Sequence, residues 1–236
     1  MKVELVALTQ PYKKGNREIV NPMYVVEQSA SVCYDSEPTA NFKIAKKCAK
    51  TKHLSVYEHI SFTFHITGVS RALLAQLTRH RHASYSVRSQ RYCDESEFEF
   101  VVPKSLNSKF SKDVISVCAF QAAMKNAMDA YDDILSGEDV SKEDARMVLP
   151  NACCTELYIT MNARALIESS HLRLCNRAQE EIRDMFGYMK KEVMGVCPEV
   201  AKLMVPSCEI NPEYPFCPEE KSCDRHPKLS EVYHAE

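Results

Sequence analysis

The sequence has no tryptophan, only five glycines among 236 residues and almost no net charge. With so few glycines, it lacks the glycine-rich turn of a dinucleotide-binding fold. Its 30 basic and 32 acidic residues give a formal net charge of −2, which argues against a broad basic face for nucleic acid. No apolar run approaches the ~20 residues of a membrane span. Hydrophobic residues make up 45% of the chain, enough for a sizeable core.

The start of the chain and its cysteines indicate the compartment. The opening MKVELVALTQPYKKGN has no long apolar run ending in a small-residue cleavage site, so we predict no secretory signal. Eleven cysteines, an odd number, cannot all pair within one chain. We therefore expect reduced thiols in a cytoplasmic protein that binds neither membrane nor nucleic acid.

Two segments alternate apolar and polar side chains with the period of a strand. The first covers 59–66 and is expected to end at Gly68, where a helix follows. The second covers 153–161. Helical periodicity predicts one long helix over Phe110–Leu135. A further helical stretch is predicted over 163–193, with Arg177 and Glu181 spaced to pair on one face.

Strands and helices follow one another irregularly, without a repeating strand–helix–strand rhythm. We predict an α+β fold with a twisted antiparallel or mixed sheet packed against long helices. One domain is expected over residues 1–205. The remaining residues, 206–236, are rich in cysteine and proline and are expected to form an irregular tail.

Residues 79–91, RHRHASYSVRSQR, concentrate cations in a chain of slightly negative charge. A solvated basic loop is one interpretation. The other is a pocket for a small phosphorylated ligand, because planar guanidinium groups bind phosphate through paired hydrogen bonds. Further arginines occur at 146, 164 and 173, and the last two stand in apolar surroundings. A cation there is unfavourable unless an anionic group meets it.

Four blocks, in this order, resemble the flavin-dependent thymidylate synthase family. They are HLSVYEHISFTFHI (53–66), Arg79-His80-Arg81 followed seven residues later by Ser89, ARMVLP (145–150) and NARALIESSHLRLCNRAQEEIR (162–183). The resemblance implies an FAD-dependent methyltransferase that converts dUMP to dTMP. It further implies methylenetetrahydrofolate as one-carbon donor, NADPH as reductant, and a homotetramer whose active sites draw residues from several subunits.

The resemblance also assigns residues to the two main ligands. For dUMP, it implies Gln76, Arg79, Arg88, Ser89, Gln90, Arg91, Arg146 and Arg173. For FAD, it implies His53, Ser55, Arg79, His80, Arg81, Asn162, Arg164 and Glu168.

Two of these residues are candidates for catalysis. A guanidinium at Arg173, placed against N3 and O4 of the pyrimidine, would favour the ionised ring and so activate C5. No histidine–carboxylate relay is evident around Ser89. We therefore expect Ser89 to position the substrate rather than to attack it.

The sequence departs from the family pattern at two positions. Val87 stands where many members have a polar residue, often Glu or Gln, so a side-chain contact there is missing. Glu168 stands where Asn or His is usual. A carboxylate beside an anionic cofactor is unfavourable unless it turns away or pairs with a cation.

The tail offers four potential zinc ligands, Cys208, Cys217, Cys223 and His226. Their spacing lacks a Cys-x-x-Cys knuckle, so we predict no metal site and keep a zinc-stabilised scaffold as an alternative. A second alternative is an RNA-binding module that uses the arginines of 79–91. It would bind RNA in a salt-sensitive manner without flavin.

Overall fold

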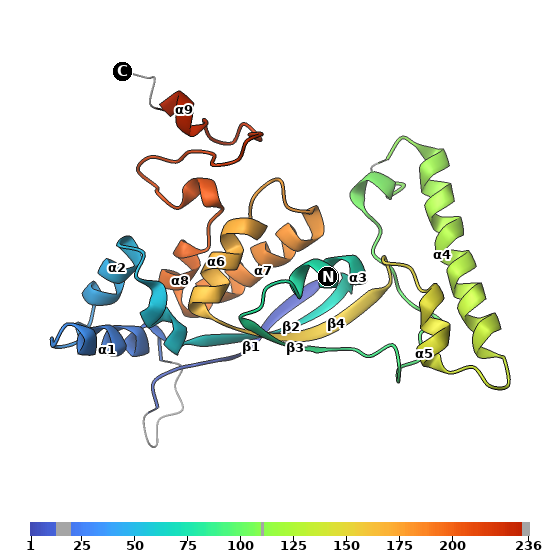
Figure 1. Ribbon diagram of the computed structural model, residues 1–236, viewed down its shortest axis with the longest axis horizontal. Helices are drawn as coiled ribbons and strands as arrows, with labels where there is room; N and C mark the ends of the chain where they lie inside the picture. The colour runs from blue at the N-terminus through green and yellow to red at the C-terminus, as the bar shows by residue number, and fades with distance from the viewer. Residues whose placement is uncertain (13–19, 110, 233–236) are drawn as a thin grey trace. The chain divides into compact units, whose positions relative to one another are not determined.

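The computed structural model describes residues 1–12, 20–109 and 111–232, and its fold is α+β as predicted (Figure 1). A four-stranded sheet has the order β1-β2-β4-β3. Its strands are β1 (Lys2–Leu8), β2 (Ser61–Ser70), β3 (Ala83–Val87) and β4 (Cys154–Asn162). Phe62, Phe64 and Ile66 of β2 are fully buried, which confirms the apolar face that their alternation predicts.

The described chain forms two compact units, each built from several segments. Unit 1 comprises Met1–Lys2, Ile66–Arg79 and Tyr85–Tyr158, and unit 2 comprises Val3–His65, His80–Ser84 and Ile159–Glu236. Strands β2 and β4 contribute residues to both units. The boundary expected at residue 205 stays a prediction.

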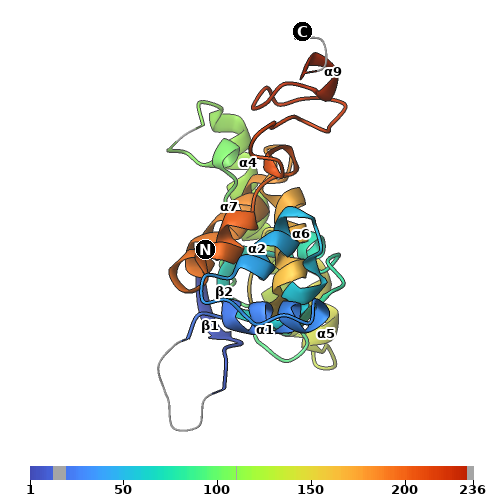
Figure 2. The ribbon, with the colours of Figure 1, turned by 90° about the vertical axis from the view of Figure 1, so that its left-hand side faces the viewer.

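Unit 2 is mainly helical. Helix α1 (Met23–Cys33) packs on α2 (Lys43–Lys50), and both contact the 3-10 helix η1 (Leu54–His59). Helix α6 (Ala163–Arg173) packs on η1, on α7 (Glu180–Val196) and on α8 (Pro198–Leu203). The 3-10 helix η4 (Ser207–Glu209) and α9 (Leu229–Val232) follow, and Figure 2 shows this last segment extending beyond α7. Buried side chains include Tyr57, Phe186 and Met189.

Unit 1 contains the long helix α4 (Val114–Leu135), which packs on η2 (Lys104–Leu106), α5 (Lys142–Ala145) and η3 (Arg146–Val148). Asp113 caps α4 by accepting a hydrogen bond from the Ser116 amide at 3.1 Å. The helix predicted over 110–135 is thus confirmed from Val114 onward, and residue 110 lies outside the described residues. Within the described residues, no helix is long and apolar enough to cross a membrane.

The expectation that Gly68 ends the first strand is wrong, because β2 continues to Ser70. Gly68 adopts a φ of +67°, which favours glycine, and a Cβ there would lie 3.1 Å from the backbone nitrogen of Met1. Ser70 then caps α3 (Arg71–Leu77) by accepting from the Leu73 amide at 3.0 Å. The glycine bends the strand at a close approach of two backbone segments and does not break it.

Two further expectations need correction. The helical stretch predicted over 163–193 is interrupted between α6 and α7, and Arg177 lies in that interruption. Because Arg177 lies outside both helices, it does not share a helix face with Glu181. It forms an ion pair with Glu219 at 2.7 Å instead. The basic loop expected over 79–91 contains strand β3, in which Ser84 and Ser86 are exposed and Ala83 and Tyr85 are half-buried. That alternation has the period of a strand, but the surrounding cations obscured it.

Candidate active site

Arg173, the last residue of α6, is held by a histidine of unit 2. Its guanidinium Nε donates to Nε2 of His80 at 2.8 Å. Oγ of Ser169, one helical turn before Arg173, lies 3.0 Å from Nδ1 of the same ring. Because Nε2 accepts from a permanent donor, we assign the ring proton to Nδ1, which donates to Ser169. We call these three residues the His80 cluster.

The His80 cluster keeps its histidine uncharged. Burial of the ring and the adjacent positive charge of Arg173 lower the pKa of His80 from 6.5 to about 4. The imidazole is therefore neutral near pH 7. It orients the Arg173 guanidinium without itself placing a negative charge beside it.

Arg164 is held in a different way. Arg164 lies in the first turn of α6, where the positive end of the helix dipole disfavours a cation. Its Nε lies 2.8 Å from Glu168, and its Nη1 lies 2.7 Å from Glu58 on η1. Hydrogen bonds to Glu168 and then Glu58 raise the pKa of Arg164. Glu168 thus pairs with a cation, one of the two arrangements under which a carboxylate is acceptable at this position.

Other residues assigned to FAD lie on the same elements of unit 2. Asn162 caps α6, since its Oδ1 accepts from the Ala165 amide at 2.8 Å. That cap uses only the oxygen, so the amide N–H groups can still donate to a ligand. His53 and Ser55 are exposed at the start of η1, the element that Glu58 connects to Arg164. The structure therefore brings a set of polar side chains together where η1 meets α6.

In unit 1, one carboxylate joins two of the arginines assigned to dUMP. Arg91 Nη2 lies 2.8 Å from Glu143 Oε2, and Arg146 Nη2 lies 3.7 Å from Glu143 Oε1. Arg146 Nε also donates to the Glu143 carbonyl at 3.1 Å. The side chain of Glu143 is 46% exposed. The two guanidinium groups therefore already hold an anionic group between them, as a phosphate would require.

The remaining residues assigned to dUMP in unit 1 have mainly local partners. Arg88 pairs with Glu95 at 3.2 Å and donates to the Asp94 carbonyl at 3.2 Å, and the hydrogen bond to Glu95 raises the pKa of Arg88. Gln76 Nε2 donates to the Ala72 carbonyl at 3.4 Å.

Ser89 and Gln90 follow strand β3, which ends at the half-buried Val87. Gln90 Nε2 lies 3.6 Å from Cys153 Sγ. Ser89 Oγ accepts from the Arg91 amide at 3.2 Å. This local turn agrees with a positioning role for Ser89.

Arg79 and Arg81 differ from the other arginines of the motif. Both are exposed, and neither has a hydrogen bond or ion pair to any other residue of the described part of the chain. An exposed cation without a carboxylate partner is suited to a ligand phosphate. The residues assigned to FAD therefore fit a cofactor that carries a pyrophosphate.

A cavity of about 630 Å³ in unit 1 does not fit a phosphorylated ligand. Five carboxylates line it, from Asp94, Glu95, Glu97, Glu99 and Glu156, and Arg88, which also lines it, pairs with Glu95. The excess of negative charge would repel a phosphate. We therefore do not assign the nucleotide to it.

The sequence interpretation missed the residues that hold the arginines. Ser169 precedes Arg173 by four residues on α6, a spacing that places both on one helix face and could have indicated it. Glu143 precedes Arg146 by three residues, a spacing that could also have indicated their pairing. The contacts of Glu143 with Arg91 and of Glu58 with Arg164 gave no comparable signal, because they join residues far apart in the sequence. Half-buried Arg71, whose Nη2 donates to the Arg88 carbonyl at 2.8 Å, was also missed.

Comparison with known proteins identifies the family of the chain. Residues 18–199 match the family model described as "Thymidylate synthase complementing protein". The flavin-dependent thymidylate synthase of Clostridium tetani is 38% identical over 241 residues, covering 90% of this chain and 93% of that protein. The enzyme of the same description from Geobacter sulfurreducens is 45% identical over 169 residues, covering 71% of this chain and 69% of that protein.

A solved structure shares the fold. The crystal structure of the flavin-dependent thymidylate synthase ThyX from Helicobacter pylori, complexed with FAD and dUMP, superposes with a TM-score of 0.64 at 26% identity. The match covers 86% of this chain and 98% of the other. The fold and the matches define a class of flavin-dependent enzymes. This chain belongs to the flavin-dependent thymidylate synthase family.

Proposed function

We propose that this chain catalyses the reductive methylation of dUMP to dTMP, with FAD as redox cofactor, methylenetetrahydrofolate as one-carbon donor and NADPH as reductant. Family membership over residues 18–199 supports the reaction. The observation that carries the catalytic assignment is the hydrogen bond from Arg173 to a neutral His80. It orients the guanidinium through an acceptor that carries no charge.

Arg173 acts on the pyrimidine. Its guanidinium, set against N3 and O4, stabilises the ionised ring and increases the electron density at C5, which is otherwise a poor nucleophile. His80 is a positioning residue that acts through Arg173. A protonated histidine would lose its acceptor and repel the guanidinium, so its lowered pKa preserves the arrangement.

The nucleotide is held by the cationic and amide side chains of the motif. Arg91 and Arg146, which both contact Glu143, bind the phosphate. Their contacts with the Glu143 carboxylate break when the phosphate binds. Ser89 positions the substrate. The full set assigned to dUMP is Gln76, Arg79, Arg88, Ser89, Gln90, Arg91, Arg146 and Arg173.

FAD, when bound, supplies the redox and one-carbon transfer chemistry. Its proposed binding site comprises His53, Ser55, Arg79, His80, Arg81, Asn162, Arg164 and Glu168. Arg79 and Arg81 provide unpaired cations for its phosphates. Glu168 is tolerated because Arg164 balances its charge at 2.8 Å. At Val87 the chain has an apolar side chain, so no polar contact forms there.

We further propose that the enzyme works as a cytoplasmic homotetramer. The absence of a membrane-spanning helix among the described residues is compatible with this, and family membership supports the assembly. Size-exclusion chromatography with light scattering tests it directly. A monomeric active enzyme would contradict it.

The reaction is tested with purified full-length protein and a complete substrate mixture. We expect flavin absorbance bands near about 370 and 450 nm after FAD is added, since the chromophore sets them. We also expect dTMP release that requires dUMP, methylenetetrahydrofolate and NADPH together. Protein that takes up no flavin and releases no dTMP would contradict the proposal. Tight, salt-sensitive RNA binding in that case would favour the RNA-binding alternative.

A further inference from the structure

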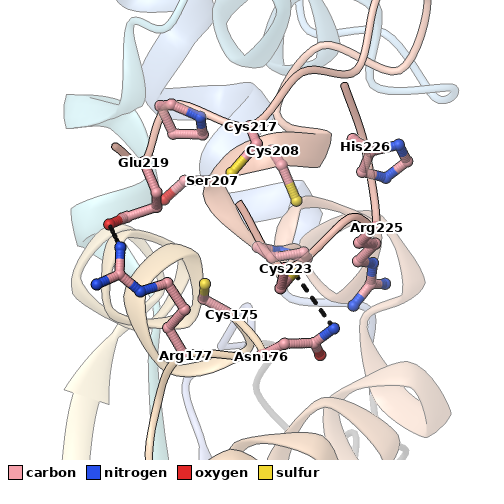
Figure 3. Close-up of a pocket in the computed structure, with 12 residues that line it drawn as sticks. Cys175, Asn176, Arg177, Ser207, Cys208, Cys217, Glu219, Cys223, Arg225 and His226 are labelled. Atoms are coloured by element: carbon pink, nitrogen blue, oxygen red, sulfur yellow. Dashed lines mark hydrogen bonds and ion pairs between the residues drawn. The ribbon is translucent and has the colours of Figure 1, made fainter. Parts of the chain in front are cut away.

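The C-terminal segment and the turn after α6 enclose a small cavity lined by thiols. Its volume is about 10 Å³, and Cys175, Cys208, Cys217 and Cys223 lie around it together with His226 (Figure 3). All belong to unit 2. A cavity of this size holds a single water or ion and excludes an organic ligand. The tail ligands lie outside residues 18–199, the part that matches the family model.

Three separate features place tail thiols in the neighbourhood of His226. Cys208 offers a sulfur, Glu209 a carboxylate oxygen and His226 a ring nitrogen, and these three atoms lie within 4.8 Å of one another. The backbone of Cys217 is held next to the residues that follow His226, because its amide donates to the Pro227 carbonyl at 2.7 Å and it forms a β-bridge with Lys228. Cys223 precedes His226 by three residues across a tight turn in which Asp224 has a φ of +61°.

His226 is prepared as a ligand by two further side chains. Its Nε2 lies 3.2 Å from Glu209 Oε1, and Arg225 holds the same carboxylate oxygen at 2.6 Å. A hydrogen bond to a carboxylate fixes the proton on Nε2 and leaves Nδ1 as the nitrogen that can bind a metal. Metal-ligating histidines typically carry such a carboxylate partner. Asn176 Nδ2 also lies 3.6 Å from Cys223 Sγ, where it can donate to a thiolate (Figure 3).

We propose that the segment 206–232 forms a structural zinc site with Cys208, Cys217, Cys223 and His226 as its four ligands. Cys208 and His226 are already close to one another, and Cys217 and Cys223, which line the same cavity, complete the coordination when zinc binds. Three thiolates and one imidazole match the tetrahedral N/S coordination of structural zinc. Zinc binding displaces the protons of the three thiols into solvent, and Glu209 orients the histidine. We depart here from the prediction of no metal site, which rested on the missing Cys-x-x-Cys spacing, because the fold places these residues around one cavity without that motif.

The charged side chains at the rim of the cavity pair with one another and do not compete with the sulfur ligands for a metal ion. Arg177 pairs with Glu219 and Arg225 pairs with Glu209, so both cations at the rim have carboxylate partners. Cys175 lies on the turn after α6 and is not one of the four proposed ligands. The zinc ion cross-links the C-terminal segment beside that turn. A tail of 31 residues (206–236) is too short to be stabilised by a hydrophobic core of its own.

The metal content of the full-length protein tests the site. After purification under reducing conditions and dialysis, we expect one tightly bound zinc per chain by elemental analysis. Cobalt substitution should give the visible absorption bands of tetrahedral thiolate coordination. Cys208→Ser and His226→Asn should lose both signals, and Glu209→Gln should weaken zinc affinity by about 10- to 100-fold. Chelation should make residues 206–236 sensitive to protease.

Two matched variants keep the test independent of folding and of the proposed enzymatic function. Cys33→Ser removes an exposed cysteine of the same unit, and Cys175→Ser removes the non-ligand thiol of the cavity; both should retain zinc. Loss of zinc in Cys175→Ser would overturn the ligand set. Wild-type protein without tight zinc or cobalt bands, or with these cysteines joined in disulfides, would overturn the site. Flavin uptake and dTMP release are separate readouts, so the failure of one proposal is distinguishable from that of the other.

Discussion

Two arginines of unit 1 and Arg173 of unit 2 are held by different kinds of partner. In unit 1, Arg88 and Arg91 meet carboxylates at 3.2 and 2.8 Å. In unit 2, Arg173 meets the neutral ring of His80 at 2.8 Å. A carboxylate fixes a guanidinium but cancels its charge, whereas a neutral acceptor fixes it and preserves the charge. Arg88 and Arg91 must therefore exchange a carboxylate for a ligand anion, whereas the His80 contact of Arg173 involves no such exchange.

Replacing Arg173 should have the largest effect. Arg173→Ala should lower kcat by about 10³-fold, the scale of losing a group that stabilises developing charge. Arg173→Lys should recover only part of the rate, because ammonium lacks the planar fork. Steady-state dTMP formation measures both, and the flavin spectrum should stay unchanged. Retained turnover in Arg173→Ala would count against its role.

Replacing His80 should have the next largest effect. His80→Phe removes the acceptor for Arg173, and a hydrogen bond to a charged group contributes about 2 kcal/mol, so kcat should fall roughly 30-fold. His80→Gln keeps a side-chain oxygen that can accept from Nε and should restore part of the rate. The rescue by Gln distinguishes positioning from bulk packing. Equal loss in both variants would argue against the neutral-acceptor role.

The pH dependence of stability should report the same residue. His80 has a folded-state pKa of about 4 against 6.5 in the unfolded chain, so the unfolded state binds more protons between these values. The free energy of unfolding should therefore fall as pH drops from 6.5 towards 4, by about 2 kcal/mol after allowance for partial exposure of the ring. Urea unfolding at several pH values measures this. His80→Gln should flatten that part of the profile; an unchanged slope would show that other groups cause it.

Removing the carboxylate between the unit 1 arginines should have a smaller effect in the favourable direction. Glu143→Gln frees Arg91 and Arg146 from an anion that competes with the phosphate of dUMP. We expect dUMP to bind about 3- to 10-fold more tightly, or roughly 1 kcal/mol. Titration calorimetry measures it. Glu138→Gln, an exposed residue of the same unit, removes the same charge and should change little. Weaker binding in Glu143→Gln would show that Glu143 orients the arginines.

The smallest effect is expected at Glu168. Glu168→Gln removes one of two carboxylates on Arg164 and should cost less than about 1 kcal/mol of stability, as exposed ion pairs do. FAD affinity should rise about two- to threefold, because the cofactor meets less negative charge. Fluorescence titration with FAD checks this. A fall in affinity would show that Glu168 contributes a direct contact.

The sequence predicted the periodic elements better than their interruptions. The buried faces of β2 and β4 and the body of α4 follow from their spacing alone. The prediction at Gly68 was wrong because the sequence does not distinguish a glycine inside a strand from one that follows a strand. The close approach of Met1 to Gly68 is a tertiary contact. Strand β3 was missed because cations obscured a two-residue period. The break between α6 and α7 carries no proline or glycine to indicate it.

The sequence by itself determined the family and the residue types of the site, because four motif blocks keep their order and spacing along the chain. Tertiary structure alone decided the long-range partners of the arginines. Glu58 meets Arg164 over 106 residues, and His80 meets Arg173 over 93. It also decided that scattered cysteines of the tail surround one cavity. Such pairs depend on how helices and turns pack, which local periodicity does not encode.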